Sequence, residues 1–212
     1  MKIICVGRNY VEHIEELNNE KPKEPIIFFK PTVSLNKSTD FSLPEFSNDI
    51  HHEIEIIFEI GKEGKMIELK NSLSYISKIG LGVDFTARDI QKKNKKKGLP
   101  WSFAKCFDNS ASISKLMNIN KFKDINNINF SLLKNKVKVQ EGNSKLMIFN
   151  IEYLIHYISQ KITLEKGDII FTGTPKGVGK ISNQDILEGY LNDEKILNIS
   201  CLLYTSDAAD EE

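Results

Sequence analysis

The segment His51–Ile60, with the sequence HHEIEIIFEI, is the clearest structural signal in the chain. From Glu53 onward charged and apolar residues largely alternate, and Ile57 is the one break in the polar face. Such alternation is typical of a β-strand with one buried face. We therefore predict a strand over 53–60, with Glu53 and Glu55 on the same face.

Two carboxylates on one strand face repel each other unless a cation lies between them. A third carboxylate, Asp84, ends a strand signal over 80–85, at a predicted strand-to-helix junction. Glu53, Glu55 and Asp84 could hold a Mg²⁺ or Mn²⁺ ion and leave about three octahedral positions for water and substrate. The alternative is a solvated strand face, since Glu59 makes the same face polar.

Two histidines, His51 and His52, directly precede the carboxylate pair. A transition-metal site that includes histidine is therefore a second interpretation of this segment. Because no cysteine lies near in the sequence, we favour a hard, oxygen-ligated ion. Taken alone, either histidine is an ordinary loop or strand-edge residue.

Outward from this segment, strand and helix signals alternate along the chain. Strands are predicted over 1–7, 25–30, 53–60 and 80–85 and after Gly167, and a hairpin within 136–147 that turns at Glu141-Gly142-Asn143. Helices are predicted over 10–18 with Asn9 as N-cap, over 87–97, and over 151–160 with Asn150 as N-cap. No internal repeat or linker divides the chain, so one domain is expected.

The composition excludes several classes of protein. The 212 residues carry 29 basic and 29 acidic side chains, so the net charge is zero and the basic surface of a nucleic-acid binder is not expected. No run of about 18 apolar residues occurs, which argues against a membrane-spanning helix. The three cysteines are far apart in no metal-binding spacing, which favours a reducing cytoplasm.

Further candidates for chemistry lie on two of the predicted helices and in the segment that follows the second. His13 and Glu16 are three residues apart, so the carboxylate could orient the imidazole as a general base; a solvated surface pair is the plain alternative. Lys105 lies among apolar neighbours, and a buried lysine needs an anionic partner. The lysines of 92–97 indicate a solvated face, or a surface that attracts an anionic substrate.

The segment Thr172–Gly179, TGTPKGVG, is rich in glycine but lacks the spacing of a nucleotide-binding loop. Its backbone amides and the Thr174 hydroxyl could hold a small carboxylate. A tight turn without a ligand is the other interpretation.

Six ordered motifs together resemble the fumarylacetoacetate hydrolase family, in its acylpyruvase-like branch. They are GRNYVEH (7–13), FKP (29–31), HHEIE (51–55), DFTARDIQ (84–91), KGLPW (97–101) and GDIIFTGTPKGVG (167–179). The resemblance implies an α+β, mainly β fold with mixed sheets coiled into a barrel-like core and few short helices. It also implies a homodimer.

The resemblance assigns roles to residues. It implies a divalent metal, Mg²⁺ or Mn²⁺, on Glu53, Glu55 and Asp84, and a water-activating dyad of His13 and Glu16 on a lid within residues 1–20. Lys105 is implied as a catalytic residue, and Arg88, Gln91 and Thr174 as residues that bind the substrate's oxo and carboxylate oxygens. The FKP segment matches as well, but we assign no chemical step to it.

The implied activity is metal-dependent hydrolysis of the carbon–carbon bond of 3-acylpyruvates to pyruvate and a carboxylate. The same site would allow oxaloacetate decarboxylation or keto–enol tautomerisation, because each passes through an enolate. A protein of another class, a catalytically silent metal- or carboxylate-binding protein, is disfavoured by the presence of both His13 and Glu16. The expected partner is a small anionic oxo acid, with no nucleic acid and no membrane.

The C-terminal residues 201–212 differ in character from what precedes them. This stretch resembles the translation of a sequencing-library transposon adapter, so we expect a single catalytic domain over 1–200 and a foreign tail; a natural, solvated acidic tail is the alternative. The abundance of Lys, Asn and Ile indicates an AT-rich, bacterial genome, and we expect a cytoplasmic protein.

Overall fold

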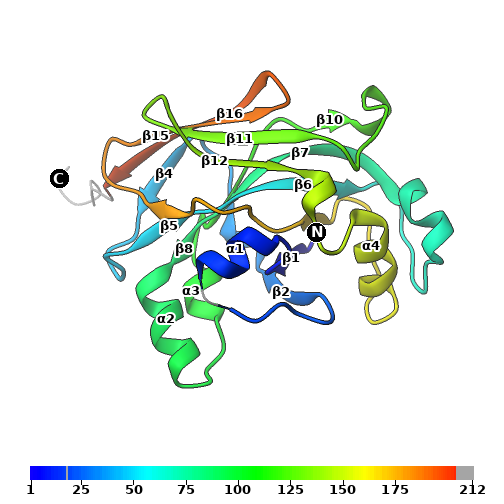
Figure 1. Cartoon of the computed structure of the whole chain (residues 1–212), viewed down its shortest axis with the longest axis horizontal. Helices are drawn as coiled ribbons and strands as arrows, with labels where there is room; N and C mark the ends of the chain where they lie inside the picture. The colour runs from blue at the N-terminus through cyan, green and yellow to red at the C-terminus, as the bar shows by residue number, and fades with distance from the viewer. Residues whose placement is uncertain (18, 204–212) are drawn as a thin grey trace, which may run out of the picture.

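A computed structural model describes residues 1–17 and 19–203, and these are arranged mainly as β-strands (Figure 1). The strands are β1 (Ile3–Gly7), β2 (Ile26–Lys30), β3 (Leu35–Asn36), β4 (Asp40–Leu43), β5 (Ile50–His52), β6 (Ile54–Ile60), β7 (Ile76–Asp84), β8 (Thr86–Ala87), β9 (Ala111–Ile113), β10 (Met117–Asn118), β11 (Asn129–Lys134), β12 (Val137–Asn143), β13 (Ile169–Phe171), β14 (Gly179–Lys180), β15 (Ile186–Leu191) and β16 (Glu194–Leu203). The α-helices are α1 (Val11–Glu16), α2 (Arg88–Lys96), α3 (Ser102–Lys105) and α4 (Ile151–Ser159). Short 3₁₀ helices cover Thr32–Ser34, Leu69–Tyr75, Ile119–Lys121 and Ser144–Leu146.

The strands form three sheets. The largest has the order β2-β1-β13-β6-β7-β9-β3, with β10 paired to β7; the second has the order β12-β11-β15-β16-β4, and the third β14-β5-β8. Figure 1 shows β11, β12, β15 and β16 across one side of β6 and β7, with α1, α2 and α3 on the other side. The predicted fold, mainly β with a curled, half-barrel sheet and few helices, is confirmed.

The hydrophobic core lies between the sheets and is rich in isoleucine. Ile54, Ile56, Phe58 and Ile60 of β6 are buried on the face opposite Glu53 and Glu55, as alternation requires. The break in the pattern, Ile57, is buried too and packs with a smaller cluster on the other face. Strand β6 is therefore covered on both sides, which is why Glu55 is buried rather than solvated.

The predicted strands over 1–7, 25–30, 53–60 and 80–85 correspond to β1, β2, β6 and β7, and the predicted helices to α1, α2 and α4. Asn150 caps α4 as expected, because its side chain accepts a hydrogen bond from the Tyr153 amide (3.0 Å).

The predicted N-cap role of Asn9 is wrong. Tyr10 occupies the N-cap position of α1, without a side-chain cap. The Asn9 side chain instead donates through Nδ2 to the backbone carbonyls of Thr172 (2.7 Å) and Phe149 (3.0 Å). Its Oδ1 accepts a hydrogen bond from the Phe149 backbone amide (2.8 Å). Buried backbone groups distant in sequence compete for this side chain, and a buried polar group needs such partners.

The predicted turn at Glu141-Gly142-Asn143 is also wrong, because these residues lie within β12. The hairpin turns at Asn135 and Lys136, which both have positive φ (51° and 68°). Gly142 serves packing instead, since a Cβ there would lie 2.7 Å from the Phe130 ring.

The structure extends beyond the expected domain end at residue 200. Strand β16 continues to Leu203 and pairs in parallel with β4, and Cys201 is fully buried. The remainder of the predicted foreign tail, 204–212, lies outside the described residues. Over the part of the chain that the structure covers, none of the helices is long and apolar enough to cross a membrane.

Candidate active site

Three carboxylates converge where β6 and β7 lie side by side. These strands are antiparallel, with Ile54 opposite Val83 and Glu55 opposite Gly82, and the Asp84 amide donates to the Glu53 carbonyl (2.9 Å). This register places ligand oxygens of Glu53, Glu55 and Asp84 within 4.8 Å of one another. All three side chains are buried, so the expected convergence holds and a solvated strand face is excluded.

Three cationic side chains lie among these carboxylates. The Lys105 ammonium group lies 2.8 Å from Glu53 Oε2 and 2.7 Å from Asp84 Oδ2 and donates to Thr86 Oγ1 (2.6 Å). Arg88 pairs with Glu53 Oε1, and Lys30 lies 2.8 Å from Asp84 Oδ1. Buried charges are tolerated when they are paired in this way.

Glu53 has two cationic partners and Glu55 has none in direct contact among the described residues, and the pKa values of these two carboxyl groups differ accordingly. Burial opposes ionisation of Glu53, but Lys105 and Arg88 outweigh it and hold the Glu53 pKa well below its ordinary value. Burial raises the pKa of Glu55 well above its ordinary value, and the neighbouring charge of Asp84 raises it further, against the Gly173 amide that donates to Glu55 Oε2 (2.6 Å). Burial lowers the pKa of Lys105, but Asp84 and Glu53 outweigh it and raise that pKa overall.

The carboxylate cluster fits a hard divalent cation. It offers only oxygen donors, as Mg²⁺ and Mn²⁺ prefer, and its oxygens are close enough to share one ion. Glu55 has no cationic side chain in direct contact among the residues the structure describes, so a bound cation would stabilise its charged form.

The alternative site with histidine ligands does not form among the described residues. The His52 Nδ1 atom bonds Gln140 Oε1 (2.9 Å), and His51 Nε2 bonds Asp49 Oδ1 (2.9 Å). In the regions covered by the structure, the cluster with metal-ligand geometry contains carboxylates only. Burial lowers the His52 pKa to about 4, so this ring is neutral at neutral pH.

Helix α1 carries the predicted dyad to the edge of the same cavity. His13 Nδ1 lies 3.2 Å from Glu16 Oε2, and Glu16 Oε1 accepts a hydrogen bond from the Gly177 amide (3.0 Å). Burial lowers the pKa of His13, against the opposing effect of Glu53 and Glu16, so the imidazole is neutral near pH 7. Glu16 thus orients the histidine and ties α1 to the glycine-rich loop.

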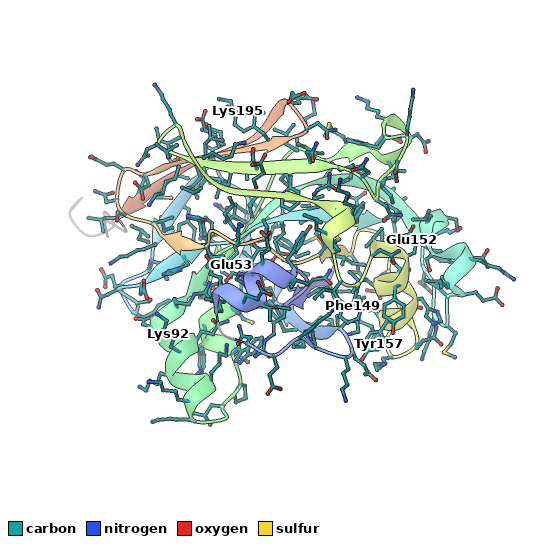
Figure 2. All side chains as sticks on the ribbon, viewed as in Figure 1. Glu53, Lys92, Phe149, Glu152, Tyr157 and Lys195 are labelled. Carbon is teal, nitrogen blue, oxygen red and sulfur yellow. The ribbon has the colours of Figure 1, made fainter. Side chains whose placement is uncertain are left out.

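One cavity joins these groups, and Figure 2 shows Glu53 beside α1 near the centre of the molecule. Eight of the nine site residues proposed from the sequence line this cavity, and the ninth, Glu16, contacts His13. The eight are His13, Glu53, Glu55, Asp84, Arg88, Gln91, Lys105 and Thr174. Its other lining residues are Val6, Gly7, Arg8, Leu17, Asn19, Phe28, Lys95 and Trp101.

The proposed substrate-binding residues are held in place by partners. Arg88 Nη1 donates to Gln91 Oε1 (2.6 Å), one turn along α2. The Thr174 hydroxyl accepts a hydrogen bond from Gln140 Nε2 (2.9 Å), so its own proton is free to be donated into the cavity. In the glycine-rich loop, the amides of Gly173 and Gly177 bind protein carboxylates, which shows that this loop is a structural connector as well as a turn.

Two residues of the site have no assigned role in the sequence analysis. Lys30 is fully buried against Asp84 and also donates to Ser110 Oγ (3.0 Å). Its position in an apolar strand is the sequence signal from which a buried, paired charge could have been predicted. Gln140 links His52 and the Ile54 amide (3.0 Å) to Thr174. Gln140 lies in a strand with alternating polar residues, and nothing in the sequence distinguishes it as a site residue.

The expected solvated face of the lysine run is only partly observed. Lys92, Lys93, Lys96 and Lys97 are exposed, whereas Lys95 is half-buried and lines the cavity.

Comparison with known proteins agrees with this geometry. The family model "Fumarylacetoacetate (FAA) hydrolase C-terminal" matches residues 2–201. The oxaloacetate decarboxylase of Dictyostelium discoideum is 43% identical over 189 residues, 88% of this chain and 87% of that protein. The oxaloacetate tautomerase FAHD1 of Bos taurus is 40% identical over 187 residues, 88% of this chain and 85% of that protein.

A solved structure has the same fold as this chain. Fumarylpyruvate hydrolase from Pseudomonas aeruginosa, in complex with Mn²⁺ and pyruvate, superposes with a TM-score of 0.91 at 28% identity, covering 96% of this chain and 90% of that one. A family match over nearly the whole described chain, with relatives of this identity and coverage, is decisive: the chain belongs to the fumarylacetoacetate hydrolase family.

Proposed function

We propose that this protein is a divalent-metal-dependent enzyme of small 2-oxo acids, and that oxaloacetate is its substrate in tautomerisation or decarboxylation. The observation that carries the proposal is the single cavity in which the buried carboxylates face a neutral, carboxylate-oriented histidine. The similarity to an oxaloacetate decarboxylase and an oxaloacetate tautomerase supports the choice of substrate.

Glu53, Glu55 and Asp84 would hold Mg²⁺ or Mn²⁺. When bound, the ion supplies positive charge that polarises the 2-oxo group and favours the enolate. Arg88, Gln91 and the hydroxyl of Thr174 would bind the carboxylate and oxo oxygens of the substrate and set its orientation.

His13 would move the proton. In tautomerisation the neutral imidazole takes a proton from C3 of oxaloacetate, the electron pair moves to the 2-oxo oxygen, and the proton returns to that oxygen. The Lys105 ammonium group lies beside the carboxylates and would stabilise the negative charge that develops on the oxygen. In decarboxylation the bond between C3 and the C4 carboxylate breaks, carbon dioxide leaves, and the electron pair moves to the 2-oxo oxygen. The enolate of pyruvate forms in this way, and C3 is then protonated to give pyruvate.

Hydrolysis of 3-acylpyruvates is a second candidate, favoured by the His13–Glu16 dyad and by the similarity to a fumarylpyruvate hydrolase. Here His13 would take a proton from water as the water oxygen attacks the acyl carbonyl. The carbon–carbon bond then breaks, leaving a carboxylic acid and the enolate of pyruvate, which accepts a proton. The dyad, whose histidine is buried beside the carboxylates, argues against a catalytically silent binding protein.

The test is turnover by the full chain with Mg²⁺ and with EDTA. Oxaloacetate would be followed through its enol absorbance and through pyruvate formation, and acetylpyruvate through pyruvate release. We expect metal-dependent consumption of oxaloacetate, lost in Glu55→Gln and retained in the exposed-site control Glu63→Gln. Pyruvate from acetylpyruvate alone would establish the hydrolase instead, and no turnover of either substrate would refute both candidates.

The cytoplasmic location and the homodimer stay predictions from the sequence and the family resemblance. Light scattering on the purified protein would measure the oligomeric state.

A further inference from the structure

One face of α2 points into the cavity along its whole length. Arg88, Gln91 and Lys95 are spaced at i, i+3 and i+7, so they lie on the same side of the helix, and all three line the cavity. Arg88 contacts Glu53 at the carboxylate cluster. Lys95 lies two turns farther along, roughly 10 Å from Arg88 along the helix axis. The cavity therefore has a second cationic position, away from the metal-binding carboxylates.

Arg8 is a further cationic residue of this cavity. It connects β1 to α1, is half-buried, and lines the same cavity. Its backbone is in the left-handed region (φ 58°), which turns the chain between the strand and the helix. Burial lowers the pKa of Lys95, and the positive charges of Arg8 and Arg88 lower it further, against the opposing effect of Glu53.

The outer cations differ from the inner ones in their partners. Lys30, Lys105 and Arg88 each contact a carboxylate. Lys95 Nζ donates to the neutral Asn19 Oδ1 (2.7 Å). Across residues 1–17 and 19–203, no carboxylate oxygen lies within 4.0 Å of a side-chain nitrogen of Lys95 or Arg8.

Two half-buried cations that repel each other and lack a carboxylate are stabilised by an anionic ligand. We propose that Arg8 and Lys95 form a subsite for a carboxylate at the end of the substrate remote from Glu53, Glu55 and Asp84. This subsite selects 2-oxo dicarboxylic acids over 2-oxo monocarboxylic acids. The inference deepens the proposed function, since it rests on the 2-oxo end binding at the carboxylate cluster.

Binding of unreactive oxo acids tests the subsite without turnover. Calorimetry with the full chain and Mg²⁺ would compare pyruvate, which has one carboxylate, with 2-oxoglutarate, which has two. We expect 2-oxoglutarate to bind more tightly, and Lys95→Gln to reduce the ratio of the two affinities by about tenfold, the effect of one charge-assisted hydrogen bond. Lys95→Arg should keep the ratio, because it keeps the charge.

The matched control is Lys93→Gln, which removes the same charge from an exposed position of the same helix. It should leave the ratio unchanged. Arg8→Gln should lower the ratio as Lys95→Gln does, and thermal unfolding would verify that each variant is folded. An unchanged ratio in Lys95→Gln, or equal weakening of both ligands, would overturn the subsite.

The outcomes separate this inference from the proposed function. If the wild type binds with the expected ratio and loses it in Lys95→Gln but turns over neither oxaloacetate nor acetylpyruvate, the subsite stands and the proposed activity fails. If oxaloacetate is turned over but Lys95→Gln leaves the ratio of the two affinities unchanged, the activity stands and the subsite fails.

Discussion

At the scale of single residues, Lys30 shows how the site balances charge. Its side chain is fully buried, and its ammonium group lies 2.8 Å from Asp84 Oδ1 and 3.0 Å from the Ser110 carbonyl. Breaking a buried ion pair by removing one partner is far more costly than breaking an exposed one, because it leaves a buried charge without compensation.

We predict that Lys30→Met lowers the free energy of unfolding by about 3 kcal/mol in the presence of EDTA, because Asp84 loses one of its two cationic partners. Urea denaturation would measure this. The control is Lys70→Met, which breaks an exposed pair with Glu68 and should cost less than about 1 kcal/mol. Equal costs for the two substitutions would contradict the argument.

His13 governs the expected pH dependence. Its pKa lies below the ordinary value of 6.5, so its neutral form persists at neutral pH and activity should fall only as the pH drops below 6.5. Glu16 raises that pKa, so Glu16→Gln should move the acid limb of kcat/KM to lower pH while reducing kcat by roughly tenfold or more.

The measurement is a pH–rate profile for wild type, Glu16→Gln and Glu15→Gln, the last an exposed carboxylate on the same helix. Glu15→Gln should leave the profile unchanged. A shift of the acid limb to higher pH in Glu16→Gln would show that His13 is not the titrating base.

At the scale of elements, the glycine-rich loop after β13 connects helix α1 to the carboxylate cluster. The Gly173 amide donates to Glu55, the Gly177 amide donates to Glu16, and the preceding Thr172 carbonyl accepts from Asn9. Gly173 has φ +102°, and a Cβ there would lie 2.7 Å from the Asn9 Cβ. Glycine is required here for both conformation and space.

We predict that Gly173→Ala is more destabilising than Gly167→Ala, by about 2 kcal/mol. Gly167 also has positive φ (+88°), but a Cβ there meets nothing within 4 Å, so its substitution isolates the backbone strain, about 1 kcal/mol. Urea denaturation of both variants gives the difference. Similar losses would mean that the contact with Asn9 relaxes without cost.

At the scale of the whole molecule, the C-terminal strand joins parts of the chain that are distant in sequence. Cys201 is fully buried and opposite Phe41 of β4, and its amide donates to the Asp185 carbonyl (2.8 Å). The Gln184 amide donates to the Cys201 carbonyl (2.7 Å). These contacts place residues 201–203 in the folded domain, so we propose that the domain extends beyond residue 200.

Two truncations test this boundary. Ending the chain after Ser200 removes the buried Cys201 and its hydrogen bonds and should lower the free energy of unfolding by about 2–4 kcal/mol. Ending it after Leu203 keeps these contacts and is the matched control for the first truncation. Equal stability of the two truncated proteins would restore the boundary at 200.

Local pattern accounts for what could be predicted. The alternation around Glu53 and Glu55 predicts one strand face, because side-chain direction follows from backbone geometry alone. The N-cap residue Asn150 predicts the start of α4 in the same local way. The order of the six motifs pointed to the family and to a candidate set of site residues, which the structure then brings together around one cavity.

The chain's own residues thus determined the strands, the helices and the identity of the groups that converge. The tertiary structure alone decided which partners they meet. Asn9 bonds Thr172, 163 positions away, and His52 bonds Gln140, 88 positions away. Lys95 lines the cavity while the other lysines of 92–97 stay exposed. The physical reason is that periodicity specifies which face a side chain occupies, whereas burial and hydrogen-bond partners depend on the elements that pack against that face.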